Sequence, residues 1–213
     1  MSKTKNSTTS IDYDWLYETV RKRFSSDDAM EDYLPKALTA EQLKQQGDDR
    51  YLSAMSRRVF QAGMQHSVVN NKWPAFEEVF WGFVPEKMLL LSPEYLEKAM
   101  RNDQIIRHRT KMVTITRNAQ FILDIRKEQG CSFGEFIANW PVTDIIGLWR
   151  LLAKRGARLG GRSAAAFLRL VGKDTFLLTS DVVARLKVSG VIDDEPTRDR
   201  KSTRLNSSHV EIS

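Results

Sequence analysis

Apolar residues recur along this chain at helical spacing, and no stretch alternates between apolar and polar positions as a half-buried strand would. The clearest helical stretch is Asn102–Leu123, which begins with a turn and continues as an amphipathic helix. Its apolar face consists of Met112, Ile115, Ala119 and Ile122. Its polar residues, Lys111, Thr114, Arg117 and Asn118, are expected on the opposite face. The pattern predicts an all-α protein built of many short helices.

Capping residues mark where these helices begin and end. Thr39 to Gln42 has the spacing of a capping box, and Ser92 before Pro93 is a typical helix start. Thr143 and Ser180 are expected to cap later helices, and Gly156 to end one. The predicted helices include Tyr13–Phe24, Arg50–Val69, Phe133–Asn139, Asp144–Arg155, Ser163–Val171 and Asp181–Lys187. The pair Trp73-Pro74 is expected to break the pattern after Val69.

Composition is that of an ordinary globular protein. The chain has 213 residues, 41% of them hydrophobic, and a mean hydropathy of −0.42. The longest apolar runs, such as Met88–Leu91, are far too short to cross a bilayer, and the N-terminus lacks an apolar signal core. We therefore expect a cytoplasmic protein with no membrane partner. Cys131 is the single cysteine and there are three histidines, so neither a metal site nor a cofactor is predicted.

Positive charge is concentrated in one part of the chain. The formal net charge is +6. Residues 132–190 hold nine basic and four acidic residues, a net charge of +5. A basic patch of this kind suits the phosphate backbone of a nucleic acid, although generic surface charge gives the same count.

The start of the helix in Asn102–Leu123 is also basic, through Arg107, His108, Arg109 and Lys111. The helix dipole favours acidic side chains at an N-terminus, so this turn gives up that stabilisation. The basic turn either binds an anionic ligand or is simply solvated surface charge.

A glycine-rich loop separates the predicted helices Asp144–Arg155 and Ser163–Val171, and the segment has the form of a helix-hairpin-helix. Glycine lets the backbone approach a phosphate without a Cβ in the way, and the amides of the following helix start are suited to an anion. The predicted DNA-binding residues are Arg107, Arg109, Arg158, Gly160, Gly161, Arg162, Ser163 and Lys173. The open alternative is an ordinary loop between two helices.

Three sequence elements resemble the DNA-3-methyladenine glycosylase I family. They are Ile105–Arg109 with Lys111 and Asn118-Ala119, the segment Gln61-Ala62-Gly63-Met64, and Arg158–Gly161, which is similar to a zinc-free branch of the family. The resemblance covers about Tyr51 to Asp193. It implies a helix-hairpin-helix glycosylase fold, with many short helices forming two lobes around a cleft. The zinc ligands of better-known members are absent.

The resemblance also implies a base pocket at the positions of Gln61, Arg58 and His66. Trp73 is a further pocket candidate that could line a cleft, although core packing is the more ordinary role for it. Gln61 matches the family, whereas Arg58 stands where the family has a glutamate and His66 where it has an aromatic residue. Arginine would repel a cationic base. The usual catalytic aspartate position falls near Thr179 or Ser180, so the catalytic residue is unknown, with Asp181 the weak candidate. A capping role is the more ordinary one for Asp181.

The expected function is therefore that of a DNA glycosylase of base excision repair. It would remove an alkylated purine such as 3-methyladenine from double-stranded DNA, by base flipping and hydrolysis of the N-glycosidic bond, and would act as a monomer. The alternative is a non-catalytic helix-hairpin-helix protein that binds DNA or senses lesions.

We expect three parts in the chain. Residues 1–10 read as a disordered leader, and residues 11–197 as the helical glycosylase-like domain. Asp199–Ser202 can be read back as the codons GAT-CGG-AAG-AGC, which begin a common sequencing adapter. Residues 198–213 are therefore expected to be an adapter-derived tail that is excluded from fold reasoning, with the natural domain truncated at its C-terminus.

Overall fold

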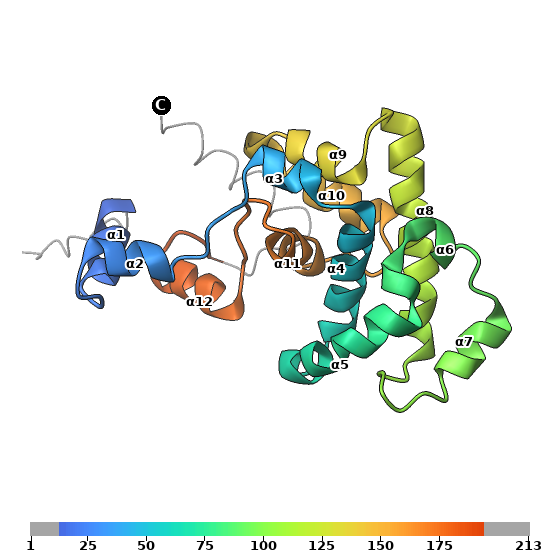
Figure 1. The fold of residues 1–213 in the computed structure, drawn as a ribbon. Coiled ribbons are helices and arrows are strands. Elements are labelled where there is room, and N and C mark those ends of the chain that lie inside the picture. The colour runs from blue at the N-terminus through green and yellow to red at the C-terminus, as the bar shows by residue number, and fades with distance from the viewer. Residues whose placement is uncertain (1–12, 194–213) are drawn as a thin grey trace, which may run out of the picture. The chain divides into compact units, whose positions relative to one another are not determined.

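The computed structural model describes residues 13–193, and every regular element in this range is a helix (Figure 1). The all-α prediction is confirmed. The predicted leader and adapter-derived tail lie outside the described residues. The helices are α1 Tyr13–Arg21, α2 Asp27–Tyr33, α3 Ala40–Gln45, α4 Asp48–Gln61, α5 His66–Val79, α6 Pro85–Met88, α7 Pro93–Ala99, α8 Arg109–Gln129, α9 Phe133–Asn139, α10 Ile145–Arg155, α11 Ser163–Leu170 and α12 Ser180–Val188, with short 3-10 turns at Trp81–Phe83 and Val142–Asp144.

The described chain divides into two compact units. The smaller unit contains residues 13–36 and 178–193, with helices α1, α2 and α12. Within it, the guanidinium of Arg185 lies 5.3 Å from the ring centre of Trp15, and Met30 is buried. Leu16 of α1 is exposed, at 49%.

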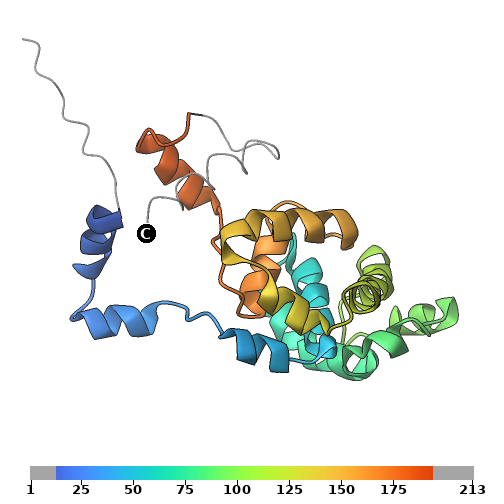
Figure 2. The same cartoon turned by 90° about the horizontal axis from the view of Figure 1, so that it is seen from above.

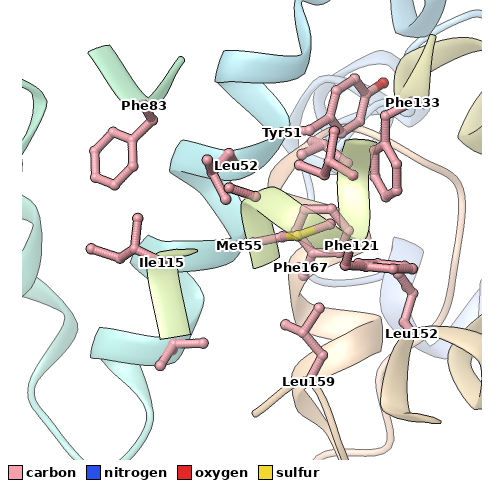
Figure 3. Packing of buried hydrophobic residues seen from close by; sticks show 14 of the residues in the cluster. Tyr51, Leu52, Met55, Phe83, Ile115, Phe121, Phe133, Leu152, Leu159 and Phe167 are labelled. Atoms are coloured by element: carbon pink, nitrogen blue, oxygen red, sulfur yellow. The ribbon is translucent and has the colours of Figure 1, made fainter. Parts of the chain in front are cut away.

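The larger unit, residues 37–177, is built around the packed pair α4 and α8. The two helices run side by side in Figure 1 and are seen close to end-on in Figure 2. Buried side chains from α4, α8, α9 and α11 meet in one core, as Figure 3 shows for Met55, Phe121, Phe133 and Phe167.

The helix predicted over Arg50–Val69 is in fact two helices. Helix α4 ends at Gln61, and Gly63 takes a left-handed backbone conformation with φ of 76° that a helix interior does not allow. Helix α5 then continues through Pro74, where a break was expected. Trp73 and Phe76, both buried on either side of Pro74, stack on each other with ring centres 4.9 Å apart.

Most local capping predictions hold. Thr39 and Gln42 form the predicted capping box, and Ser92 caps α7. Two caps differ by one residue, because the Asp144 side chain rather than Thr143 accepts from the amide of Gly147, and Thr179 rather than Ser180 caps α12. None of the helices in residues 13–193 has the length and apolar character needed to cross a membrane.

Candidate nucleic-acid interface

Helix α8 carries a row of buried polar residues that the sequence pattern assigned to its exposed face. Lys111, Thr114 and Asn118 are 5%, 4% and 0% exposed. They lie three or four residues apart and so share one face. The prediction was wrong for these three because α8 is covered on both sides, so that a polar stripe on it is internal. Arg117, in contrast, is exposed as expected.

Lys111 fixes the C-terminal end of α4. Its Nζ donates to the carbonyl oxygen of Phe60 at 3.1 Å and to that of Ala62 at 2.8 Å. These are carbonyls at the negative end of the α4 dipole, where a cation is stabilising. Burial, and then the charges of Arg158 and Arg58, lower the pKa of Lys111.

Asn118 fixes the loop between α10 and α11. Its Oδ1 accepts from the amide of Ala157 at 2.7 Å, and its Nδ2 donates to the carbonyl of the same residue at 3.3 Å. A buried amide that satisfies both main-chain groups of one loop residue determines where that loop lies. Helix α8 therefore holds the end of α4 through Lys111 and the glycine-rich loop through Asn118.

The loop itself is tightly built. A Cβ at Gly156 would lie 2.6 Å from the side chain of Leu159, so only glycine fits there. Leu159 is fully buried, whereas Arg158 and Arg162 on either side of it are exposed. Arg158 has a φ of 61°, in the left-handed region that non-glycine residues rarely adopt. Gly161 is also left-handed, and a Cβ there would meet nothing within 4 Å, which leaves open space beside the loop.

Four basic residues interact electrostatically here: Arg58, Lys111, Arg158 and Arg162. Arg58 is half-buried on α4, and its Nε is buried without a hydrogen-bond partner. Burial, and then the charge of Arg162, lower the pKa of Arg58. Within residues 13–193, none of the four forms an ion pair with a carboxylate. We call this group the cationic cluster.

Gln61, the last residue of α4, follows Arg58 by one helical turn and is 5% exposed. Its Nε2 donates to the Asn70 Oδ1 at 3.1 Å, and the same oxygen accepts from the Nε of Arg57 at 3.1 Å. This hydrogen bond holds the side chain of Gln61 against α5.

The other predicted pocket residues are placed differently. Trp73 is a core residue, 4% exposed, whose Nε1 donates to the Ser53 Oγ at 2.9 Å. His66 is the exposed first residue of α5. The structure therefore brings Arg58 and Gln61 together on the last turn of α4, with Trp73 in the core and His66 at the surface.

Lys173 was predicted to contact DNA, but in the structure its side chain is buried. Its Nζ donates to the carbonyl oxygens of Trp140 at 2.8 Å and Ala138 at 3.2 Å, and it is 5% exposed. Burial lowers its pKa. Lys173 thus stabilises the C-terminal end of α9. The sequence alone did not show that this basic side chain is buried and not on the surface.

We expect Lys173→Met to test this structural role. The substitution removes the donor to two carbonyls and should lower the free energy of unfolding by about 1–2 kcal/mol. Because the side chain is buried, DNA affinity should stay within twofold. Urea unfolding and a DNA-binding titration measure the two quantities. A large loss of affinity in a variant of unchanged stability would restore Lys173 to the DNA-binding residues.

The start of α8 has two exposed arginines in different environments. Arg107 is exposed just before the helix, whereas Arg109 forms an ion pair with Glu97 of α7. Glu97 therefore supplies part of the negative charge that the first turn of α8 lacks. His108, the N-cap residue, makes a 3.0 Å hydrogen bond with the hydroxyl of Thr110 through Nδ1.

Asp181 belongs to the smaller unit. It is exposed in the first turn of α12, whose cap is Thr179. A carboxylate in a first turn is stabilised by the helix dipole, which accounts for its presence without catalysis. A catalytic role for Asp181 stays a prediction.

One open groove, of about 920 Å³, lies elsewhere in the larger unit and contains none of the predicted site residues. Its polar lining includes Asp48, which accepts from the amide of Phe133 at 3.0 Å and pairs with Arg126. Burial raises the pKa of the Cys131 thiol beside it, so the reactive thiolate is disfavoured. Among residues 13–193, no three His, Cys, Asp or Glu side chains gather as metal ligands would.

The fold is that of the all-helical DNA glycosylases. The 3-methyladenine DNA glycosylase I of Staphylococcus aureus shares it with a TM-score of 0.54 at 21% identity, over 75% of this chain and 93% of that one. A second crystal structure of 3-methyladenine DNA glycosylase I gives a TM-score of 0.51 at 20% identity, over 70% and 90%.

The chain belongs to the methyladenine glycosylase family, whose model matches residues 25–155. A curated relative, the DNA-3-methyladenine glycosylase of Haemophilus influenzae, is 34% identical over 77 residues. That alignment spans 36% of this chain and 41% of the relative, less than half of either.

Proposed function

We propose that this protein is a monofunctional DNA glycosylase of base excision repair. It removes an alkylated purine such as 3-methyladenine from double-stranded DNA, and it acts as a cytoplasmic monomer. The α10–α11 segment serves as a helix-hairpin-helix that binds the DNA backbone, and Gln61 contributes to the base pocket. Membership of the methyladenine glycosylase family supports the reaction class.

The observation that carries the proposal is the arrangement around Asn118. Its two hydrogen bonds to Ala157 hold the glycine-rich loop beside the end of α4, where Gln61 lies. A glycosylase needs a group that binds the backbone next to a group that receives the flipped base. Open space beside Gly161 lets a phosphate approach the main chain, with Arg158 and Arg162 as counter-charge.

The reaction needs little help from a general acid. In 3-methyladenine the base already carries a positive charge, so it leaves as a neutral molecule when the N-glycosidic bond breaks. Positive charge then develops on the sugar, and water adds to the sugar carbon. Binding and orientation of the flipped nucleotide supply most of the acceleration in such a case. Strong catalysis by a carboxylate is therefore not required of Asp181.

The test is release of free base by the full chain from methylated duplex DNA, followed by chromatography. We expect 3-methyladenine to appear above its spontaneous rate, and none from unmethylated duplex. Gln61→Ala should lower the release on the order of tenfold while DNA affinity is retained, because a pocket residue acts after the backbone is bound.

A folded protein that binds duplex DNA and releases no methylated base would contradict the glycosylase proposal. It would favour the non-catalytic, lesion-sensing alternative. The positive charge of Arg58, in the position where the family has a glutamate, is the feature of the chain that fits this alternative.

A further inference from the structure

A short chain of hydrogen bonds holds the side-chain amide of Gln61. The Nε of Arg57 and the Nε2 of Gln61 both donate to the Oδ1 of Asn70, each at 3.1 Å. Arg57 and Gln61 lie one turn apart on α4, and Asn70 lies on α5. The three side chains therefore connect the last turn of α4 to the helix that follows it.

The arginine determines which atoms of the two amides face each other. A guanidinium group carries only donors, so the Asn70 atom beside it must be the oxygen and not the nitrogen. An amide oxygen only accepts, so the Gln61 atom beside Asn70 must be Nε2. Turning either amide over would bring two donors or two acceptors together. The remaining atom of Gln61, the acceptor Oε1, is thus oriented by Arg57 through Asn70.

The Oε1 of Gln61 is available to a ligand. No group in residues 13–193 donates to it. The side chain as a whole is 5% exposed, yet Oε1 keeps accessible surface, unlike the fully enclosed Oγ of Ser56 on the same helix. The turn that follows is open, because Ala62 is exposed and a Cβ at Gly63 would meet nothing within 4 Å. A ligand can therefore reach this oxygen from outside.

A lone acceptor selects the chemistry of its partner. Phosphate oxygens and carbonyl groups have no hydrogen to donate, whereas an amino group on the edge of a base does. Adenine carries an amino donor at the position where guanine has the acceptor O6. A largely buried acceptor that faces another acceptor stays without a hydrogen bond, and this mismatch is costly. An oxygen held in this way therefore favours an adenine over a guanine.

We propose that Arg57 and Asn70 are positioning residues, which hold Gln61 with its Oε1 toward the flipped base. The oxygen then accepts a hydrogen bond from the amino group of an alkylated adenine, while Nε2 stays with Asn70. Arg57 and Asn70 act through Gln61 and do not contact the base. This inference rests on the proposed function, which places a flipped base beside Gln61.

The first experiment compares Asn70→Asp with Asn70→Leu in the full chain. Asn70→Asp keeps an acceptor for both donors, so release of 3-methyladenine from saturating methylated duplex should stay within about twofold of the native rate. Asn70→Leu leaves the Gln61 amide free to rotate, and the rate should fall about tenfold, the equivalent of one hydrogen bond. DNA affinity should be retained in both. Asn70 is exposed, so both variants are expected to fold, which circular dichroism checks.

The second experiment reverses the chain of hydrogen bonds with Arg57→Glu. Its carboxylate oxygens lie as many bonds from the backbone as the Nε of arginine, but they only accept. Asn70 should then turn its nitrogen toward them, and Gln61 should turn Nε2 toward the base. The ratio of 3-methyladenine to 3-methylguanine released should fall on the order of tenfold. The matched control, Arg117→Glu, makes the same change of charge at an exposed residue of α8 and should keep the native ratio.

The outcomes separate this inference from the proposed function. Base release with the native rate in Asn70→Leu and the native ratio in Arg57→Glu overturns the positioning role and leaves the glycosylase proposal standing. Equal losses in Asn70→Asp and Asn70→Leu also overturn it, because the accepting oxygen would then be irrelevant.

If the native chain releases no base, the glycosylase proposal fails, and binding of free 3-methyladenine and 3-methylguanine to the same variants decides the inference. A preference for 3-methyladenine that is kept in Asn70→Asp and lost in Asn70→Leu supports the positioning role in a non-catalytic protein. No binding of either base, or a preference that Asn70→Leu retains, overturns it.

Discussion

Replacement of both Arg158 and Arg162 by glutamate is expected to weaken binding to duplex DNA on the order of 100-fold at moderate salt. Each arginine is exposed on the loop that Asn118 holds in place, and each offers a charge-assisted hydrogen bond to a phosphate. Two such bonds at about 1.5 kcal/mol each correspond to this factor. The slope of log affinity against log salt should fall by about 2 as well.

The control for this double variant must carry the same change in net charge. Lys44 and Lys127 are exposed and line the groove that contains none of the loop residues, so their replacement by glutamate provides it. We expect the control to keep most of its affinity. Equal losses in the two double variants would mean that DNA responds only to the net charge of +6, and that the loop has no special role.

Elements defined by local capping could be predicted from the sequence alone. The range of α9, Phe133–Asn139, was predicted without error, because Ser132 caps its start through the amide of Glu135 and Trp140-Pro141 ends it. The Thr39 capping box is equally local. In both cases the determining interaction spans three residues and needs no knowledge of the tertiary structure.

Features that depend on distant contacts could not be predicted in this way. Lys111 and Lys173 look like surface residues in the sequence, yet both are buried donors to main-chain carbonyls far along the chain. Their carbonyl partners lie at helix ends that come near them only after folding. For Lys111 and Asn118 the sequence held one signal, because both belong to an element that resembles the family. That resemblance marked the two residues but did not show which main-chain groups they bind.

Sequence and structure together change the interpretation of Arg58. The resemblance placed it in a base pocket, where its charge conflicts with a cationic base. In the structure its electrostatic partners are Arg162 and Lys111, and its Nε is unpartnered. That environment favours an anion.

Asn118→Ala is expected to affect stability and DNA binding together. The side chain is fully buried, and its removal leaves the amide and carbonyl of Ala157 without their partner as well as a small cavity. We expect the free energy of unfolding to fall by about 2–4 kcal/mol, and the unfolding temperature by roughly 5–10 °C. Gln120→Ala is the matched control, because within residues 13–193 this exposed amide on the same helix bonds only to Asp124, at 2.8 Å.

The binding measurement for Asn118→Ala is made at a temperature where both variants are fully folded, so that lost stability does not appear as lost affinity. The arginines of the loop are unchanged in sequence, yet the loop is no longer held by α8. The salt slope should therefore decrease toward the value of the double glutamate variant. A destabilised variant with the native slope would show that packing of Leu159 is enough to position the loop, because that side chain remains fully buried in the core.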